Sequence, residues 1–189
     1  MGEWGRVMKR LFAGVAVTAT EEMRRTLAQL QRELRQEKIR WTRLEKLHLT
    51  VEFFGFVELE RIPELEGALA QAAAGTPPFA LSLGGLGTFG RPRHPRVLWM
   101  GVEATGLMVL HDATVAALRT AGWRPEARPF APHLTLGRME RLQDAAKFQS
   151  RLAAACAWPA QVQEVRELIL YESLNGQYLP LSRWALAGK

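Results

Sequence analysis

Cysteine is nearly absent from this chain of 189 residues, in which Cys156 is the only one. A single cysteine excludes an intrachain disulfide, and a chain of this length can bury a full core without one. The sequence also has no H-E-x-x-H motif, no cysteine pair and no tight carboxylate-histidine cluster, which are the usual patterns of zinc ligands. We therefore expect no metal, no other cofactor and a cytoplasmic protein.

Long apolar runs are missing as well, and no segment approaches the roughly 20 apolar residues of a membrane span. The run LFAGVAV follows the basic residues Arg6, Lys9 and Arg10 and so weakly imitates a signal peptide, but it is equally typical of a first β-strand. We interpret it as a strand and expect no association with a membrane.

Acidic residues are fewer than basic ones, because 19 Asp and Glu stand against 25 Lys and Arg. The net charge is +6 and the pI is near 10.1. Such a chain attracts polyanions over about a Debye length. The charge balance therefore favours RNA, DNA or nucleotides as partners, although it does not by itself establish them.

Strand-like and helix-like segments alternate along the chain, and no low-complexity tract or linker divides it. Each half contains a helix, a strand that opens with His-Leu-Thr, a second helix and a further strand. This order predicts an α+β fold, a single domain over residues 1–189 with two lobes facing one another, and we expect a monomer. The expected helices are 21–35, 60–73, 107–121 and 142–157, and the expected strands are 11–17, 48–55, 77–89, 96–102, 133–138, 162–171 and 177–187, with a turn at Asn175-Gly176.

Histidine is scarce, with four in the chain, yet two of them stand in the same setting, HLTVEFFG from His48 and HLTLGR from His133. If each histidine begins a strand, the period of two puts His48 with Thr50, and His133 with Thr135, on one face. Facing lobes would bring these side chains around one cleft. A pair of imidazoles can serve as general base and general acid, and hydroxyls can donate hydrogen bonds to an anion held between them.

A single histidine at the start of a strand is usually a surface or boundary residue. We interpret the other two histidines in such plain terms, His94 as a loop residue and His111 as an exposed helix residue. Two His-x-Thr motifs in a chain with so few histidines are seldom produced by chance. The repeated motif therefore favours a functional site, but residue chemistry does not decide which ring would be the acid and which the base.

Five segments in a fixed order carry a resemblance to a known family: RLFAGVAV, HLTVEFFG, PRVLWMGV, FAPHLTLGR and LYESLNGQY. Together they resemble the 2H phosphoesterase superfamily, and in detail its RNA 2′,3′-cyclic phosphodiesterase branch, also called 2′-5′ RNA ligase. The resemblance spans nearly the whole chain. It implies two antiparallel-sheet-plus-helix lobes related by a pseudo-twofold around a central cleft. It also implies metal-independent hydrolysis of RNA 2′,3′-cyclic phosphate ends to 2′-phosphates, and in some members slow ligation that forms 2′-5′ bonds.

The resemblance further implies roles for the motif residues. His133 would be the proton acceptor that activates water, and His48 would be the proton donor to the departing 3′ oxygen. Thr50, Thr135 and Arg138 would bind the substrate phosphate. For Arg138, strict strand alternation predicts the face opposite His133, unless a strand end or a bulge brings it back. The implied partner is RNA with a 2′,3′-cyclic phosphate, or with 2′ and 5′ ends to be joined.

Other residues could contact RNA as well. The arginines of RPRHPR and RPEARP are expected in loops at the edge of the cleft, as phosphate contacts or as ordinary solubilising charges. Trp123, Phe130 and Tyr171 could stack a terminal base, although aromatic residues are more often part of the core. The glycine-rich GGLGTFG lacks the Lys-Ser/Thr of a phosphate loop and predicts a turn. Two other functions stay open: a non-catalytic RNA- or nucleotide-binding module, and a phosphodiesterase acting on a small cyclic nucleotide.

Overall fold

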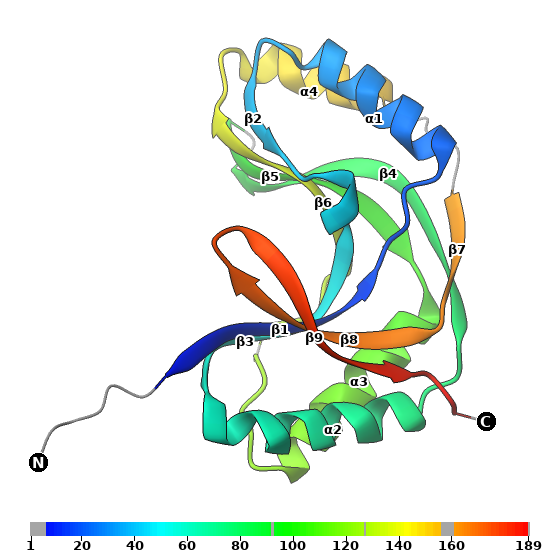
Figure 1. Ribbon diagram of the computed structural model, residues 1–189. Coiled ribbons are helices and arrows are strands. Elements are labelled where there is room, and N and C mark those ends of the chain that lie inside the picture. Colours follow the sequence, from blue (N-terminus) through cyan, green and yellow to red (C-terminus); the bar gives the residue numbers. More distant parts are fainter. Residues whose placement is uncertain (1–6, 92, 127, 156–160, 189) are drawn as a thin grey trace, which may run out of the picture.

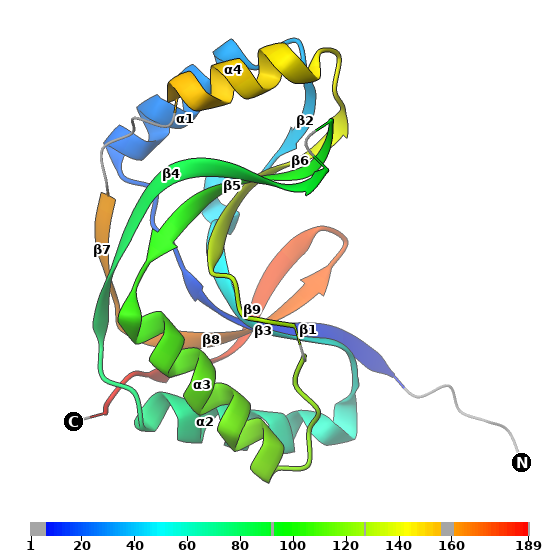
Figure 2. The ribbon, with the colours of Figure 1, turned by 180° about the vertical axis from the view of Figure 1, so that it is seen from behind.

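In the computed structural model, which describes residues 7–91, 93–126, 128–155 and 161–188, the chain forms two lobes (Figure 1). Each lobe is an antiparallel sheet with a pair of helices on its outer face, and the inner faces of the two sheets are turned toward one another (Figures 1 and 2). The predicted α+β class, with two antiparallel-sheet lobes, is therefore confirmed.

The first sheet has four strands in the order β3-β1-β8-β9 and is covered by two helices: β1 (Met8–Ala16), β3 (His48–Glu58), β8 (Glu167–Leu174), β9 (Gln177–Ala185), α2 (Ile62–Ala74) and α3 (Thr105–Thr120). The second sheet has five strands in the order β2-β6-β5-β4-β7 and is also covered by two helices: β2 (Lys38–Trp41), β4 (Phe79–Arg91), β5 (His94–Glu103), β6 (His133–Arg141), β7 (Gln161–Val165), α1 (Glu21–Glu33) and α4 (Ala145–Ala155). The short 3₁₀ helices η1 (Leu44–Lys46) and η2 (Leu59–Arg61) precede β3 and α2.

Each lobe is assembled from both halves of the sequence. The chain starts in the first sheet with β1, crosses to the second lobe for α1 and β2, and returns for β3. The last two strands, β8 and β9, complete the first sheet from the C-terminal end of the chain. The two His-Leu-Thr strands lie in different sheets, β3 in the first and β6 in the second. The crossings of the chain therefore place the two motifs on opposite lobes.

The first helix begins where the sequence predicts it. The Thr20 hydroxyl accepts a hydrogen bond from the Met23 N–H, and two glutamates follow in the first turn, where the helix dipole favours negative charge. Met23, Leu27 and Leu30 recur at helical spacing and are buried. This buried face packs α1 against the main core.

The β8–β9 hairpin also follows its sequence. Leu168 to Tyr171 form a continuous buried run in β8, as expected for a strand that lies between β1 and β9 and is covered on both faces. The turn that follows has Asn175 and Gly176 at φ 49° and 73°, which are the two positive φ values of a type I′ hairpin. The predicted turn at Asn175-Gly176 is confirmed.

Three predictions about the strands were wrong, and one of them is the single strand 162–171, which is divided into β7 of the second sheet and β8 of the first. The segment GGLGTFG, expected as a turn, lies inside β4, where Gly85 at φ 64° is taken up as a bulge against β5. His94, expected in a loop, is the first residue of β5 and pairs with Arg91. The strand β2 was not predicted, because four residues of mixed polarity show no clear period. The end of the fourth predicted helix, with Cys156, lies outside the described residues.

The main core is one continuous cluster of buried side chains that runs from one lobe to the other. A second, smaller cluster of Phe12, Ile169 and Tyr171, with Tyr178 packed against it, includes two rings that contact His48 at 4.8 Å between centroids. The small cluster is therefore in direct contact with His48 of the first motif.

Among the described helices, none is long and apolar enough to cross a membrane.

Candidate active site

The two motif histidines are the first residues of β3 and β6. In both strands the burial alternates as the sequence predicts, because Leu49 and Leu134 are fully buried while the histidine and threonine on either side are half-buried. Buried leucines therefore anchor each strand to the core. The opposite face of each strand presents an imidazole and a hydroxyl that are not packed in the core.

The two imidazoles are held in the same way. Nδ1 of His48 lies 2.8 Å from the carbonyl oxygen of Lys46, and Nδ1 of His133 lies 2.8 Å from the carbonyl oxygen of Ala131. In each case the partner is two residues earlier in the chain. A carbonyl can only accept, so Nδ1 carries the proton and donates it, which leaves Nε2 of each ring to exchange a proton with a substrate.

A bulge follows the threonine in each motif. In the pairing of β3 with β1, Thr50 and Glu52 lie opposite consecutive residues, and Val51 is passed over. In β6, Thr135 and Gly137 lie opposite consecutive residues of β5, and Leu136 is passed over in the same manner. The two motifs therefore share a bulge at the same position as well as a sequence. A pseudo-twofold relation between the lobes predicts this equivalence.

The bulge in β6 corrects the expectation for Arg138. Strict alternation predicted the face opposite His133, but the extra residue resets the alternation, and Arg138 lines the same cavity as His133 and Thr135. The corresponding residue of β3, five positions after His48, is Phe53, which lines this cavity too and is 42 % exposed. A guanidinium and an aromatic ring thus occupy equivalent places on the two sheets.

The motif residues line two cavities. The larger, of about 620 Å³, is lined by side chains of both lobes, which include Thr50, Phe53, His133, Thr135 and Arg138. His48 lines a second cavity of about 350 Å³. His48 and Thr50 are successive residues on one face of β3, so this strand contributes to the lining of both cavities. Four of the five residues expected at the site line the larger cavity, and the fifth, His48, lines the smaller one.

The ring of His48 is packed among aromatic side chains. Its centroid lies 4.8 Å from those of Phe12 and Tyr178 and 6.1 Å from that of Tyr171. Burial lowers the pKa of His48 below its usual 6.5, and the positive charges of His133 and Arg138 lower it further, while the hydrogen bond to Lys46 acts in the opposite direction.

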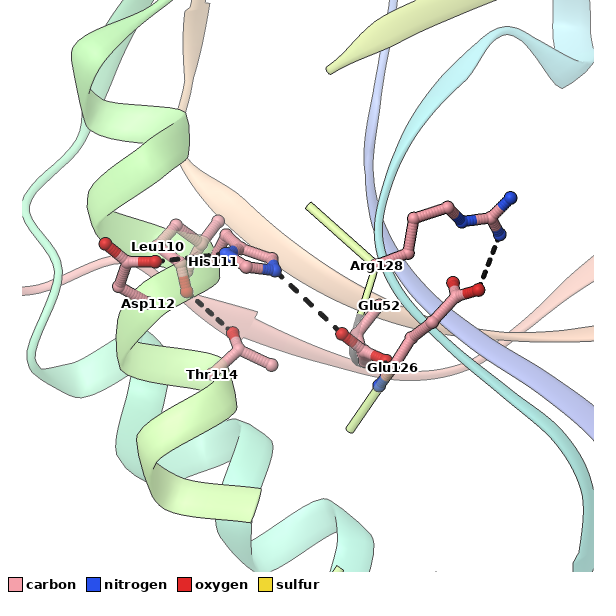
Figure 3. A network of polar contacts seen from close by, with 7 residues as sticks. All are labelled: Glu52, Leu110, His111, Asp112, Thr114, Glu126 and Arg128. Carbon is pink, nitrogen blue, oxygen red and sulfur yellow. Dashed lines mark hydrogen bonds and ion pairs between the residues drawn. The ribbon is translucent and has the colours of Figure 1, made fainter. Parts of the chain in front are cut away.

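Sequence analysis missed a polar network at the wall of the larger cavity (Figure 3). Glu52 of β3, only 6 % exposed, accepts a hydrogen bond of 3.1 Å from the Glu126 N–H, and its other oxygen lies 4.0 Å from Nε2 of His111. Glu126 in turn pairs with Arg128. His111, expected as an exposed helix residue, is only 17 % exposed at its side chain and stacks on Phe130 with 4.1 Å between ring centroids.

The network holds the segment that leads into β6. Glu52 binds the segment at Glu126, and His111 binds it at Phe130, one residue before the Ala131 carbonyl that orients His133. Glu52 therefore connects the first lobe with the orientation of the second histidine. Strict alternation would put Glu52 on the same face as His48 and Thr50, but the bulge after Thr50 changes its direction. Its partners His111 and Glu126 lie 59 and 74 residues away and could not be found from a local pattern.

Glu52 offers a first test. Burial raises the pKa of its carboxyl group, so the ionised form is penalised in the fold and its contribution to stability declines as pH rises through the folded pKa. Glu52→Gln keeps an oxygen for the Glu126 N–H and is expected to match or exceed the wild type in free energy of unfolding at pH 8. Glu52→Ala leaves that N–H without its partner and should fall below Glu52→Gln by about 1–3 kcal/mol in urea denaturation. Equal stability of the two variants would contradict the role of the network.

Of the three aromatic residues considered for base stacking, two are packed in the core clusters and one lines the larger cavity. Trp123 lies under the guanidinium of Arg61 at 3.9 Å and packs against the main core, and Tyr171 is buried in the cluster beside His48. Phe130 lines the larger cavity, as do Arg96 and Arg128 from the two arginine-rich segments. Pro92 and Ala127 of those segments lie outside the described residues.

Within the described part of the chain, no group of three or more His, Cys, Asp or Glu side chains is placed to hold a metal ion. Two titratable side chains that line the larger cavity contact the backbone, since Glu52 accepts a hydrogen bond from the Glu126 N–H and His133 donates one to the carbonyl of Ala131. The five predicted residues that line the two cavities supply two imidazoles, two hydroxyls and a guanidinium. These groups can bind a phosphate and move protons on either side of it.

Comparison with known proteins decides the family. The profile described as "2'-5' RNA ligase superfamily" matches residues 20–177, which include both motifs. This chain belongs to the 2′-5′ RNA ligase superfamily. The resemblance inferred from the five sequence segments is thereby confirmed, and so is the fold that it implied.

Relatives in this superfamily carry a common description. An RNA 2′,3′-cyclic phosphodiesterase of Thermotoga maritima is 32 % identical over 133 residues, which cover 69 % of this chain and 71 % of the relative. A protein of the same description from Geobacillus stearothermophilus is 33 % identical over 169 residues, or 88 % of this chain. The match spans 53 % of the Geobacillus relative, so this chain corresponds to about half of its length. The chain is thus homologous to RNA 2′,3′-cyclic phosphodiesterases over most of its residues.

Solved structures agree with the sequence relatives. The crystal structure of TT0787 from Thermus thermophilus superposes with a TM-score of 0.74 and 26 % identity, covering 95 % of this chain and 99 % of that chain. Escherichia coli LigT in complex with 3′-AMP superposes with a TM-score of 0.67 and 26 % identity, with the same coverage of both chains. The superfamily fold therefore extends over nearly the whole of this chain.

Proposed function

We propose that this protein hydrolyses RNA 2′,3′-cyclic phosphate ends to 2′-phosphates by a metal-independent mechanism with two histidines. The observation that carries the proposal is the equivalent setting of His48 and His133: each begins a strand, each is held through Nδ1 by the carbonyl two residues earlier, and each belongs to a different sheet. The names of the superfamily relatives support the substrate class.

The opposed rings suit in-line displacement at phosphorus. In such a step the attacking water and the departing ester oxygen lie on opposite sides of the phosphorus atom, so one group must take a proton on one side and another must give a proton on the other. Two imidazoles on facing sheets supply these two groups. Water forms the new bond to phosphorus, the bond to the 3′ oxygen breaks, and the proton of the acid ends on that oxygen.

The family resemblance assigns the base role to His133 and the acid role to His48. The environment of His48 adds a condition, because burial lowers its pKa and so favours the neutral ring in the free protein. An anionic cyclic phosphate between the rings has the opposite effect, since it stabilises the imidazolium by charge attraction. In this proposal the bound substrate therefore restores to His48 the proton that it donates.

This condition predicts a difference between two pH profiles. Both kcat and kcat/KM should be bell-shaped, and the alkaline limb of kcat/KM, which reports the free enzyme, should lie at lower pH than that of kcat, which reports the complex. The reason is that a bound anion raises the pKa of His48 and so preserves its protonated form to higher pH. The limbs are macroscopic values of the coupled pair. Steady-state rates between pH 4 and 10 measure them, and coincident alkaline limbs would argue against His48 as the donor.

The remaining motif residues complete the phosphate site. Thr50 and Thr135 would donate hydrogen bonds to the non-bridging oxygens, and Arg138 would neutralise the charge that they share. Phe53 and Phe130, which line the same cavity, offer apolar surface to the terminal nucleoside. In this arrangement one ester oxygen points at the proton donor, so a single regioisomer is expected.

The decisive experiment uses an oligonucleotide with a 2′,3′-cyclic phosphate end, incubated with the protein in EDTA, and identifies the product by phosphorus NMR. The expected result is full turnover in the chelator and the 2′-phosphate as the only product. Loss of activity that a divalent ion restores would reject the metal-independent mechanism. A mixture of 2′- and 3′-phosphates, or the 3′ isomer alone, would reject the proposed orientation of the ring.

A further inference from the structure

We propose that the smaller cavity, beside His48, is a second RNA subsite that receives the nucleotide preceding the cyclic-phosphate end. The inference rests on the proposed function and adds to it the part of the substrate that the motif residues do not touch. The cavity measures about 350 Å³, within the range of pockets that hold small ligands. The end of β1, the start of α1, η1 and the β8–β9 hairpin form its wall, and Figure 1 shows the hairpin extending into the space between the two sheets.

The smaller cavity reaches the motif residues at His48. His48 lines it, and Thr50, two residues further on the same face of β3, lines the larger cavity. In a 2′,3′-cyclic phosphate the preceding strand leaves from the 5′ carbon of the terminal ribose. With the base of that nucleoside in the larger cavity, the cavity beside His48 is left for the 5′ phosphate and the nucleotide before it.

The linings of the two cavities suit different parts of the RNA. The larger cavity is lined by the carboxylates of Glu52 and Glu126, by the guanidinium groups of Arg96, Arg128 and Arg138, and by three phenylalanine rings, which suit a base. The smaller cavity is lined by the cations of Arg24 and Lys46, with Glu45 as its acidic residue. Two positive charges face one negative charge in the smaller cavity, so it can accept the phosphodiester that precedes the terminal nucleoside.

The cation of Lys46 has a fixed place in this subsite. Its Nζ donates a 2.7 Å hydrogen bond to the carbonyl of Gly176 at the tip of the β8–β9 hairpin, while its own carbonyl orients His48. Tyr178 of the same hairpin is half-buried and stands with its ring edge-on to His48. The hairpin thus brings an ammonium group and an aromatic ring together next to the catalytic cleft, a combination that single-stranded RNA binds through its backbone and a base.

The test compares two substrates in three proteins. The substrates are a dinucleotide that ends in a 2′,3′-cyclic phosphate and the corresponding nucleoside 2′,3′-cyclic phosphate. The proteins are the wild type, Arg24→Gln and the matched control Arg25→Gln. Arg25 is the next residue of α1, is 78 % exposed at its side chain, pairs with Glu21 at 3.1 Å and lines neither of these two cavities. The readout is the ratio of kcat/KM for the dinucleotide to kcat/KM for the nucleoside substrate.

We expect the wild type to prefer the dinucleotide, with a ratio that falls about tenfold in Arg24→Gln, since one charge-assisted contact is lost, and that is unchanged in Arg25→Gln. The salt dependence of kcat/KM should also be steeper for the dinucleotide, by a slope of about 0.7 for its additional phosphate, and this difference should be lost in Arg24→Gln. A ratio near one in the wild type, or equal falls in both variants, would overturn the subsite. No turnover of either substrate would instead reject the proposed function.

Discussion

Replacing His48 or His133 by alanine is expected to lower kcat by roughly 10²–10⁴-fold, the range that a single general acid or base supplies. Each ring is the only proton carrier proposed for its side of the phosphorus atom, so water must replace it in the variant. The double variant should lose little more than the more impaired single variant, because the acid and the base act as a unit. Single-turnover rates on an oligonucleotide with a 2′,3′-cyclic end measure all three losses.

The matched control is His94→Ala. His94 is also the first residue of a strand, β5, but it is exposed and does not line either cavity at the motifs. Its removal should leave turnover unchanged. Because His48 packs among aromatic rings, circular dichroism and the midpoint of thermal unfolding must show that His48→Ala is folded. A folded His48 or His133 variant with nearly normal turnover would show that this ring is not catalytic.

Replacing Thr50 or Thr135 by valine is expected to lower kcat by roughly 10²-fold, as is found when one donor to a developing oxyanion is removed. Valine keeps the shape of the side chain and removes its hydroxyl. Both threonines are half-buried and line the larger cavity from opposite sheets, so each can reach a different non-bridging oxygen. Negative charge grows on these oxygens as water attacks, and the loss should therefore appear in kcat more than in KM.

Serine variants separate the hydroxyl from the methyl group. Thr50→Ser and Thr135→Ser keep the donor and should recover most of the rate. Thr120→Val, on an exposed turn of α3 whose hydroxyl bonds only to its own helix, should have no effect. If the valine variants raised KM and left kcat intact, the threonines would bind the ground state of the substrate and not the transition state.

Much of this site could be predicted from local pattern. The alternation of His48, Leu49 and Thr50 in β3, and its repetition in β6, already requires that leucines are buried and that an imidazole and a hydroxyl share the opposite face. The turn at Asn175-Gly176 was equally predictable, because a type I′ hairpin needs positive φ at both positions. Arg138 shows where local pattern ends, since its direction depends on a bulge opposite β5 that only strand pairing creates.

The sequence by itself determined the family, the α+β class and the four histidine and threonine residues of the motifs, because these follow from residue order and from the period of a strand. Only the tertiary structure decided what surrounds them. The partners of Glu52 are far from it in the sequence and reach it because α3 packs against β3. The aromatic rings around His48 come from elements up to 130 residues away and reach it because β8 pairs with β1. Contacts of that range depend on how whole sheets and helices pack, and no local period in the chain encodes them.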